Sequence, residues 1–148
     1  MKIAVGSDHA GYRLKTELVQ YLQESGYQAV DEGTDSCDSV DYPDFAGKVC
    51  DAIAGGEAEM GLLICGTGVG MSMAANKCKG IRAACCCNEY MAEMSRSHNN
   101  ANVLTLGARV LTPEIAVRIL DVFLVTEFEG GRHERRVGKI MQYEEKRP

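Results

Sequence analysis

Short apolar runs alternate with segments of helical periodicity along the whole chain, and this alternation constrains the fold more than any other feature. Residues 60–65 (MGLLIC) form a continuous apolar run, which is typical of a central parallel strand buried on both faces. Strands that alternate with helices indicate a parallel sheet covered by helices. We therefore predict a Rossmann-like three-layer α/β/α sandwich with a five-stranded parallel sheet, built as one domain over residues 1–148.

Capping residues and helical spacing locate the individual elements. Gly26 is expected just beyond the first helix as its C-cap, and Asn88 and Thr112 are expected to begin later helices as N-caps. The strands are expected at 2–5, 27–30, 60–65, 81–86 and 102–106. The helices are expected at 11–25, 43–54, 71–75, from 88 onward, 112–126 and 132–146. The last helix has few apolar residues, so we expect it to pack on a partner subunit.

Composition and charge exclude several classes of protein. The 16 Lys and Arg residues against 21 Asp and Glu give a formal charge of -5, so the chain has no overall positive field for nucleic acid. No apolar stretch approaches the roughly 20 residues that span a bilayer, and Asp8 interrupts any early signal-peptide core. We therefore expect a cytoplasmic protein that binds neither nucleic acid nor membrane.

The seven cysteines indicate reduced thiols. Their number is odd and no two are spaced as CxxC. Cys85, Cys86 and Cys87 lie in an apolar run expected to be a strand, where successive side chains point to opposite faces and cannot converge on one ion. We therefore expect no bound metal.

Polar segments follow three elements of the predicted sheet. Residues 7–11 and 65–70 come directly after strands, and residues 97–100 come after the fourth strand and its helix. Open parallel sheets bind ligands beyond the carboxyl ends of their strands. We expect all three segments to face one crevice.

The glycine loop at 66–70 (GTGVG) offers consecutive backbone N–H groups next to a helix N-terminus, which suits a phosphate or an oxyanion. The loop lacks the Lys of a nucleotide-binding P-loop, and Met71 stands where a dinucleotide fingerprint has its last glycine. Alternatively, the loop is a tight turn that only joins a strand to a helix.

Cys65 comes directly before this loop. A helix N-terminus and a ring of amides favour the thiolate, which would let Cys65 serve as a base. The alternative is that Cys65 is a buried cysteine that acts as a small hydrophobic side chain.

Asp8, His9, His98 and Asn99 supply groups suited to proton transfer near neutral pH. Asp8 has the alternative role of capping the first helix, and either histidine has the alternative of being an ordinary surface or core group. Arg132 and Arg136 are four residues apart and would share a helix face, where they could bind a dianion or form only a solvated surface. Arg109, just past the fifth predicted strand, is a further candidate.

Together these segments resemble the ribose-5-phosphate isomerase type B family, which also contains the subunits of galactose-6-phosphate isomerase. The resemblance covers nearly the whole chain. The matching motifs are SDHAG at 7–11, DYPDFA at 41–46, ICGTGVGMSMAANK at 64–77, GIRAA at 80–84, SRSHNNANVLTLGARV at 95–110 and FEGGRHERRV at 128–137.

The resemblance implies an enzyme that interconverts D-ribose 5-phosphate and D-ribulose 5-phosphate through an enediolate, without metal or organic cofactor. It implies that Cys65 is the proton-shuttling base and that His98 opens the sugar ring, assisted by Asp8. The oxyanion cradle would be formed by Gly66, Thr67, Gly68, Val69 and Gly70. The sugar and phosphate contacts would come from Asp8, His9, Asn99, Arg109, Arg132 and Arg136.

The resemblance also implies a homo-oligomer, a dimer or a dimer of dimers, with sites between subunits, acting in the pentose phosphate pathway of carbohydrate metabolism. In another branch of the family a glutamate replaces Met71 and the cysteine is lost, so Cys65 is the base expected here. Two alternatives remain open: isomerisation of a six-carbon sugar phosphate, either allose 6-phosphate or galactose 6-phosphate, and a regulator that binds a sugar phosphate without chemistry.

Overall fold

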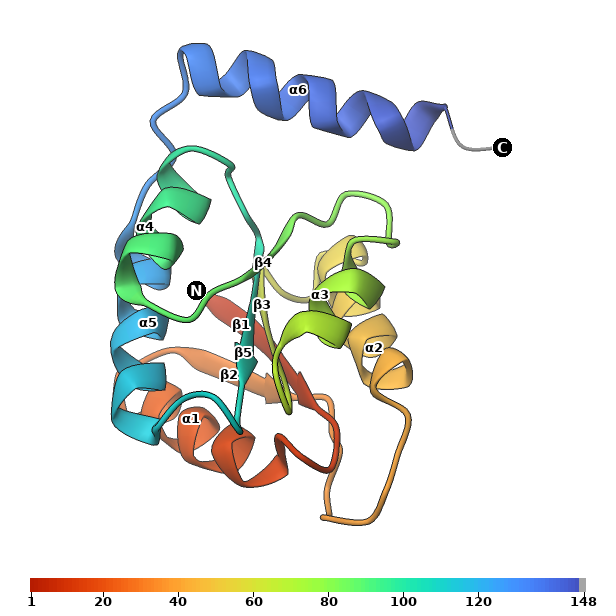
Figure 1. Cartoon of the computed structure of the whole chain (residues 1–148), viewed down its shortest axis with the longest axis vertical. Helices are drawn as coiled ribbons and strands as arrows, with labels where there is room; N and C mark the ends of the chain where they lie inside the picture. Colours follow the sequence, from red (N-terminus) through yellow and green to blue (C-terminus); the bar gives the residue numbers. More distant parts are fainter. Residues whose placement is uncertain (147–148) are drawn as a thin grey trace.

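The computed structural model describes residues 1–146, in which five strands alternate with six helices (Figure 1). The strands are β1 (Lys2–Ser7), β2 (Gln28–Asp31), β3 (Met60–Cys65), β4 (Ala83–Cys85) and β5 (Val103–Gly107). The helices are α1 (Tyr12–Glu24), α2 (Tyr42–Ala54), α3 (Val69–Ala75), α4 (Glu89–Ser97), α5 (Pro113–Val125) and α6 (Arg132–Glu145). Within residues 1–146, no helix is long and apolar enough to cross a membrane.

All strand pairs are parallel, in the order β2-β1-β3-β5-β4. The apolar run 60–65 is the central strand, which confirms the five-stranded parallel sheet predicted from the sequence. Its register places Leu62 opposite Val5 of β1 and Leu104 of β5. The three side chains are fully buried, because both faces of this part of the sheet are covered.

Helices cover the two faces of the sheet. On one face α1, α4 and α5 pack against Ile3, Val5 and Leu62, and on the other α2 and α3 pack against Ala4 and Leu63. Consecutive strand residues thus enter different cores, as the pleat requires. Helix α6 lies apart from both layers, across the edge at which the strands begin (Figure 1).

The two predicted N-caps are confirmed, whereas the C-cap of α1 is Ser25 and the predicted Gly26 is the next residue. The Asn88 side chain accepts a hydrogen bond from the Met91 N–H at 2.8 Å, and Thr112 Oγ1 accepts one from the Ile115 N–H at 3.3 Å. Gly26 follows the end of α1 with a φ of +87°. These local signals explain why most helix ends lie within a residue or two of the expected positions.

Strand β4 is shorter than the predicted range 81–86. The Asn102 side chain accepts the Arg82 N–H at 2.8 Å. In a longer strand this N–H would instead donate to a backbone carbonyl of the neighbouring strand. Asn76 makes a similar pair with Ala83, accepting from its N–H at 2.8 Å and donating to its carbonyl at 2.9 Å. Side-chain amides therefore replace ladder bonds where β4 begins.

Gly11 allows α1 to begin against the central strand. A Cβ atom at Gly11 would lie 2.5 Å from the Ile64 carbonyl oxygen, a distance at which a side chain does not fit. The segment between Asp8 and α1 therefore touches the backbone of β3 directly.

Candidate active site

The carboxyl ends of β1, β3 and β5 meet at one edge of the sheet. Asp8 donates its N–H to the Ile64 carbonyl at 3.2 Å, and the Ala108 N–H donates to the Cys65 carbonyl at 2.8 Å. The next residue, Arg109, also contacts the segment after β3, since its N–H donates to the Gly66 carbonyl at 2.9 Å. Two of the three segments expected from the sequence, 7–11 and 65–70, are thus side by side.

The Cys65 sulfur faces the glycine loop. Only 5% of Cys65 is exposed, and its Sγ accepts a hydrogen bond from the Gly68 N–H at 3.1 Å. Gly68 has a left-handed φ of +81°, and a Cβ there would lie 3.0 Å from the Leu106 backbone. Glycine therefore allows the loop to direct an amide at the sulfur, where an N–H donor stabilises negative charge.

Two side chains from outside the loop flank its ends. The Arg109 guanidinium lies over Gly66, with Nη1 3.3 Å from the Cβ position. At the other end the Tyr42 ring lies over Gly70, with Cζ 2.9 Å from the Cβ position. No role for Tyr42 is predicted from the sequence, although Tyr42 belongs to the DYPDFA motif and begins α2 directly before Pro43.

Part of the expected oxyanion cradle is already engaged within the loop. The Gly68 N–H points at sulfur, and the Val69 N–H donates to Thr67 Oγ1 at 3.2 Å. A bound oxyanion would therefore use the remaining amides, or would displace the Thr67 hydroxyl from Val69.

Asp8 and His9 lie at the same edge of the sheet. Asp8 is buried, and its Oδ1 accepts the Gly11 N–H at 3.0 Å, which is the local bond expected if it helps to begin α1. His9 Nδ1 accepts the Val40 N–H at 3.2 Å, so Nε2 is the ring nitrogen left for another partner. The bond also fixes the loop before α2 against the candidate site.

The third segment, residues 97–100, lies at the opposite edge of the sheet from residues 7–11 and 65–70. The expectation that all three segments face one crevice is therefore wrong within a single chain. Helix α4 starts beside the carboxyl end of β4 and runs back, and His98 is its C-cap. The next strand begins at Val103, which is paired with Gly61, the second residue of β3. The length of β5, about 17 Å at 3.3 Å per residue, therefore separates the two edges.

At this second edge His98 meets His133 of α6. The two rings are stacked, with centroids 4.1 Å apart and planes inclined by 11°. His133 Nε2 lies 3.4 Å from Glu129 Oε2. Burial, followed by the neighbouring charges of His98 and Arg132, lowers the pKa of His133 from its ordinary value. In the sequence His133 stands out only as part of a basic run, so this stack is not predicted from it.

Arg132 and Arg136 lie on α6 close to the stack. Arg132 begins the helix that crosses this edge and Arg136 lies four residues further along it, and Asn99 follows His98 directly. In the described part of the chain, the second edge therefore holds the four remaining site residues predicted from the sequence: His98, Asn99, Arg132 and Arg136.

His98, Glu129 and His133 also form a group that could hold a metal ion, with ligand atoms within 4.8 Å of one another. A histidine nitrogen binds a metal through a lone pair that lies in the plane of its ring. Because the planes of the two stacked rings are nearly parallel, the lone pairs of their nitrogens do not point at one common position. One ring would have to rotate before the group could bind a metal.

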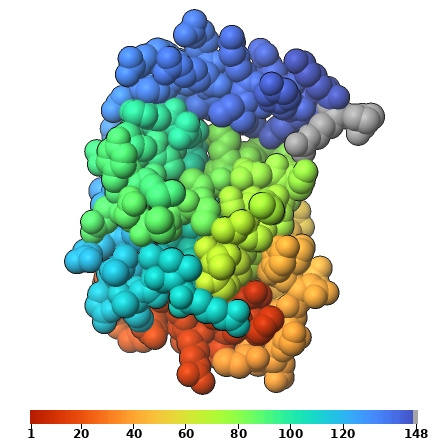
Figure 2. Space-filling model, viewed as in Figure 1, coloured from red at the N-terminus to blue at the C-terminus, as the bar shows by residue number. Residues whose placement is uncertain are grey.

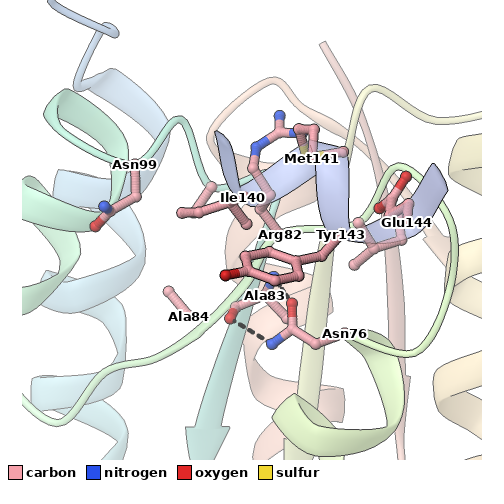
Figure 3. A pocket seen from close by; sticks show the side chains of 11 residues that line it. Asn76, Arg82, Ala83, Ala84, Asn99, Ile140, Met141, Tyr143 and Glu144 are labelled. Atoms are coloured by element: carbon pink, nitrogen blue, oxygen red, sulfur yellow. Dashed lines mark hydrogen bonds between the residues drawn. The ribbon is translucent and has the colours of Figure 1, made fainter. Parts of the chain in front are cut away.

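A cavity of about 460 Å³ lies between α6 and the body of the protein (Figure 3). Ile140, Met141 and Tyr143 of α6 line it, together with Arg82 and Asn99 from the body. Figure 2 shows α6 lying over the segments that precede β4 and β5. This cavity is at the second edge of the sheet, away from Cys65, and includes one predicted site residue, Asn99.

Comparison with known proteins gives consistent matches over the whole chain. The family model described as Ribose/Galactose Isomerase matches residues 3–140. The ribose-5-phosphate isomerase B of Escherichia coli (strain K12) is 51% identical over 146 residues, which are 99% of this chain and 98% of that protein.

Solved structures agree with this match. A ribose-5-phosphate isomerase B from Clostridium thermocellum superposes with a TM-score of 0.98 at 55% identity, covering 99% of both chains. The Mycoplasma genitalium ribose-5-phosphate isomerase B with bound ribulose 5-phosphate superposes with a TM-score of 0.94 at 44% identity, covering 99% of this chain and 97% of that one.

Proposed function

Because the chain belongs to the ribose/galactose isomerase family, we propose that it interconverts D-ribose 5-phosphate and D-ribulose 5-phosphate through an enediolate. The observation that carries the proposal is the Cys65 sulfur, which accepts the N–H of Gly68 at the carboxyl edge of the sheet. A thiolate in that position has an adjacent loop of amides for the oxygen that becomes negative. The bound ribulose 5-phosphate in the Mycoplasma genitalium structure supports the same class of substrate.

In the proposed chemistry, Cys65 moves one proton between two carbons. The thiolate takes the proton from C2 of the open-chain aldose, and the electron pair forms the C1–C2 double bond while O1 becomes negative. O1 then takes a proton, O2 gives one up, and the Cys65 thiol returns its proton to C1, which leaves a ketone at C2. Amides of the loop from Gly66 to Gly70 would stabilise the oxyanion, each donor being worth about 2.7–4 kcal/mol.

His98 would open the furanose ring by acid–base catalysis, with Asp8 assisting, before this proton transfer begins. Arg132 and Arg136 would bind the phosphate from one face of α6, since they are separated by one helical turn. The remaining contacts to sugar and phosphate are assigned to His9, Asn99 and Arg109.

We propose that each complete site forms between two copies of the chain. Cys65, Asp8 and Arg109 lie at one edge of the sheet, and His98, Arg132 and Arg136 lie at the other, so one copy cannot direct both groups at one sugar. A symmetric pair would place the second edge of each copy over the first edge of its partner and form two equivalent sites. The exposed Ile140 and Tyr143 side chains of α6 suit such a contact.

We also propose that the protein acts in the cytoplasm, in the interconversion of pentose phosphates. Its seven cysteines are free, and a reducing compartment would keep the Cys65 thiol available for proton transfer.

The direct test is to mix purified protein with ribose 5-phosphate in deuterated water, and to measure ribulose 5-phosphate and the deuterium on its C1. The proposal expects ketose, which carries deuterium at C1 whenever the Cys65 thiol exchanges its proton with solvent before returning it. Sugar binding without ketose or exchange would instead identify a binding protein. Parallel measurements of kcat/KM with allose 6-phosphate and galactose 6-phosphate establish which sugar is preferred, because one extra carbon is discriminated by about 10- to 200-fold.

A further inference from the structure

Thr105 lies in the middle of β5, next to the glycine loop. It is fully buried, and its backbone is paired on both sides, with Leu63 of β3 and Cys85 of β4. The Thr105 hydroxyl donates to the Gly68 carbonyl at 2.9 Å. A side chain held by two neighbouring strands is a rigid support for the loop residue that it contacts.

Gly68 links this support to the sulfur of Cys65. Its N–H donates to Cys65 Sγ at 3.1 Å, and its carbonyl accepts both the Thr105 hydroxyl and the Ser72 N–H, the latter at 3.0 Å. Thr105, Gly68 and Cys65 therefore form a continuous series of hydrogen bonds from the sheet to the proposed base.

Cys85 of β4 restricts the same loop from another direction. Its Sγ lies 3.7 Å from the Thr67 carbonyl oxygen and 3.1 Å from the position that a Cβ of Gly68 would take. The loop is thus held by contacts from two neighbouring strands, of which the Thr105 hydroxyl makes the shorter hydrogen bond.

We propose that Thr105 is a positioning residue for the isomerase reaction, whose hydroxyl holds Gly68 so that the Gly68 amide stays directed at the Cys65 sulfur. The inference rests on the proposed function, in which Cys65 is the base. Without the hydroxyl, the Gly68 carbonyl keeps only its bond within α3, so the loop is free to turn the amide away from sulfur. The sulfur then loses a donor that stabilises its negative charge.

A simpler role for the hydroxyl is to satisfy its own hydrogen bond in the core, as buried hydroxyl groups generally do. In that case Thr105→Val would change the stability of the protein but not the behaviour of Cys65. The test therefore needs a measurement on Cys65 itself, independent of turnover.

The experiment compares wild type with Thr105→Val, which keeps the shape of the side chain, and Thr105→Ser, which keeps the hydroxyl. Thr126→Val is the matched control, because it removes a threonine hydroxyl that donates to the Val122 carbonyl at the end of α5, outside the loop. For each protein, kcat and KM are measured with ribose 5-phosphate. The rate at which iodoacetamide labels Cys65 is followed by peptide mass spectrometry between about pH 6 and 9.

Thr105→Val is expected to lower kcat about tenfold with little change in KM, since misplacement of a reacting group by 1 Å can cost about 10²-fold and the loss of one supporting hydrogen bond is a smaller disturbance. Iodoacetamide should label Cys65 more slowly near neutral pH than in wild type, because the thiolate has lost a donor. Thr105→Ser should restore both quantities, and Thr126→Val should change neither. If Thr105→Val does not fold, Thr105→Ala is measured in the same way.

Identical labelling of Cys65 in Thr105→Val and wild type at every pH would overturn the inference, and so would an unchanged kcat. Failure of the proposed function is distinguishable from both outcomes, because wild type would then produce no ketose. Even then, slower labelling of Cys65 in Thr105→Val than in wild type would support the role of Thr105 in holding Gly68.

Discussion

Cys65 and His98 lie at opposite edges of the same parallel sheet. Cys65 ends β3, whereas His98 follows α4, the helix that returns from β4 to the edge where the strands begin. The chemistry proposed for the chain needs both side chains at one sugar. Because the two residues lie at opposite edges of one sheet, the proposed site combines Cys65 of one copy with His98 of another.

Replacing Cys65 by alanine is expected to lower turnover of ribose 5-phosphate by about 10²- to 10⁴-fold, the usual contribution of a general base. The fold should persist, because the change only removes a sulfur at the edge of the core. Ketose formation and the circular dichroism spectrum are the measurements. Cys78→Ala, which alters a cysteine outside the loop, is the control and should remain active.

Mixing two inactive variants tests the shared site. Cys65→Ala and His98→Ala are each expected to be inactive, but a mixed dimer contains one site with neither change. Equal amounts, exchanged at random, should therefore recover about a quarter of wild-type activity, because half of the dimers are mixed and each has one intact site of two. Activity that stays at the level of the separate variants would show that both residues act within one copy.

Arg136→Ala is expected to weaken substrate binding through loss of a charge-assisted hydrogen bond to phosphate. Such a bond is worth about 1.5–3 kcal/mol, which corresponds to a fall in kcat/KM of about 10- to 150-fold. Arg135→Ala removes the same charge from the adjacent position on α6 and is the matched control. An equal fall in kcat/KM in the two variants would contradict a specific contact of Arg136 with phosphate and would indicate a general effect of charge.

The His98–His133 stack predicts how stability depends on pH. Burial lowers the pKa of His133 below its usual 6.5, so as the pH falls the unfolded chain binds this proton before the folded protein does. The free energy of unfolding should therefore decline as the pH falls through about 6.5, and the decline should level off once folded His133 is protonated.

His133→Phe keeps an aromatic ring for the stack but removes the titration. Its free energy of unfolding, measured by urea denaturation between about pH 7.5 and 5.5, should decline less than that of wild type. Parallel curves for the two proteins would contradict the assignment of this pH dependence to His133.

Features that depend on neighbouring residues in the sequence were predicted well. The central strand 60–65, the caps Asn88 and Thr112, and the Cys65–Gly68 contact each involve residues within a few positions of one another. Here capping, glycine conformation and apolar spacing act locally and can be recognised in the sequence.

Few contacts between distant segments were predicted. Residues 7–11 and 65–70 meet as expected at the carboxyl ends of their strands, but other long-range contacts were missed. Thr105 and Gly68 are 37 positions apart, and their hydrogen bond depends on β5 lying beside β3. The meeting of His98 with His133 depends on the path of α5 and the turn before α6. The placement of residues 97–100 was wrong because a helix that follows a parallel strand carries its last residues back to the opposite edge.

The contact of Gly11 with the Ile64 carbonyl limits how the molecule can be redesigned for other sugars. Residue 11 has no room for a side chain beside that carbonyl, so the segment that carries Asp8 cannot be altered there without moving the backbone of β3. The segment before α2 offers another place to make room for a longer carbon chain, because a side-chain hydrogen bond from the Val40 N–H to His9 holds it against the candidate site.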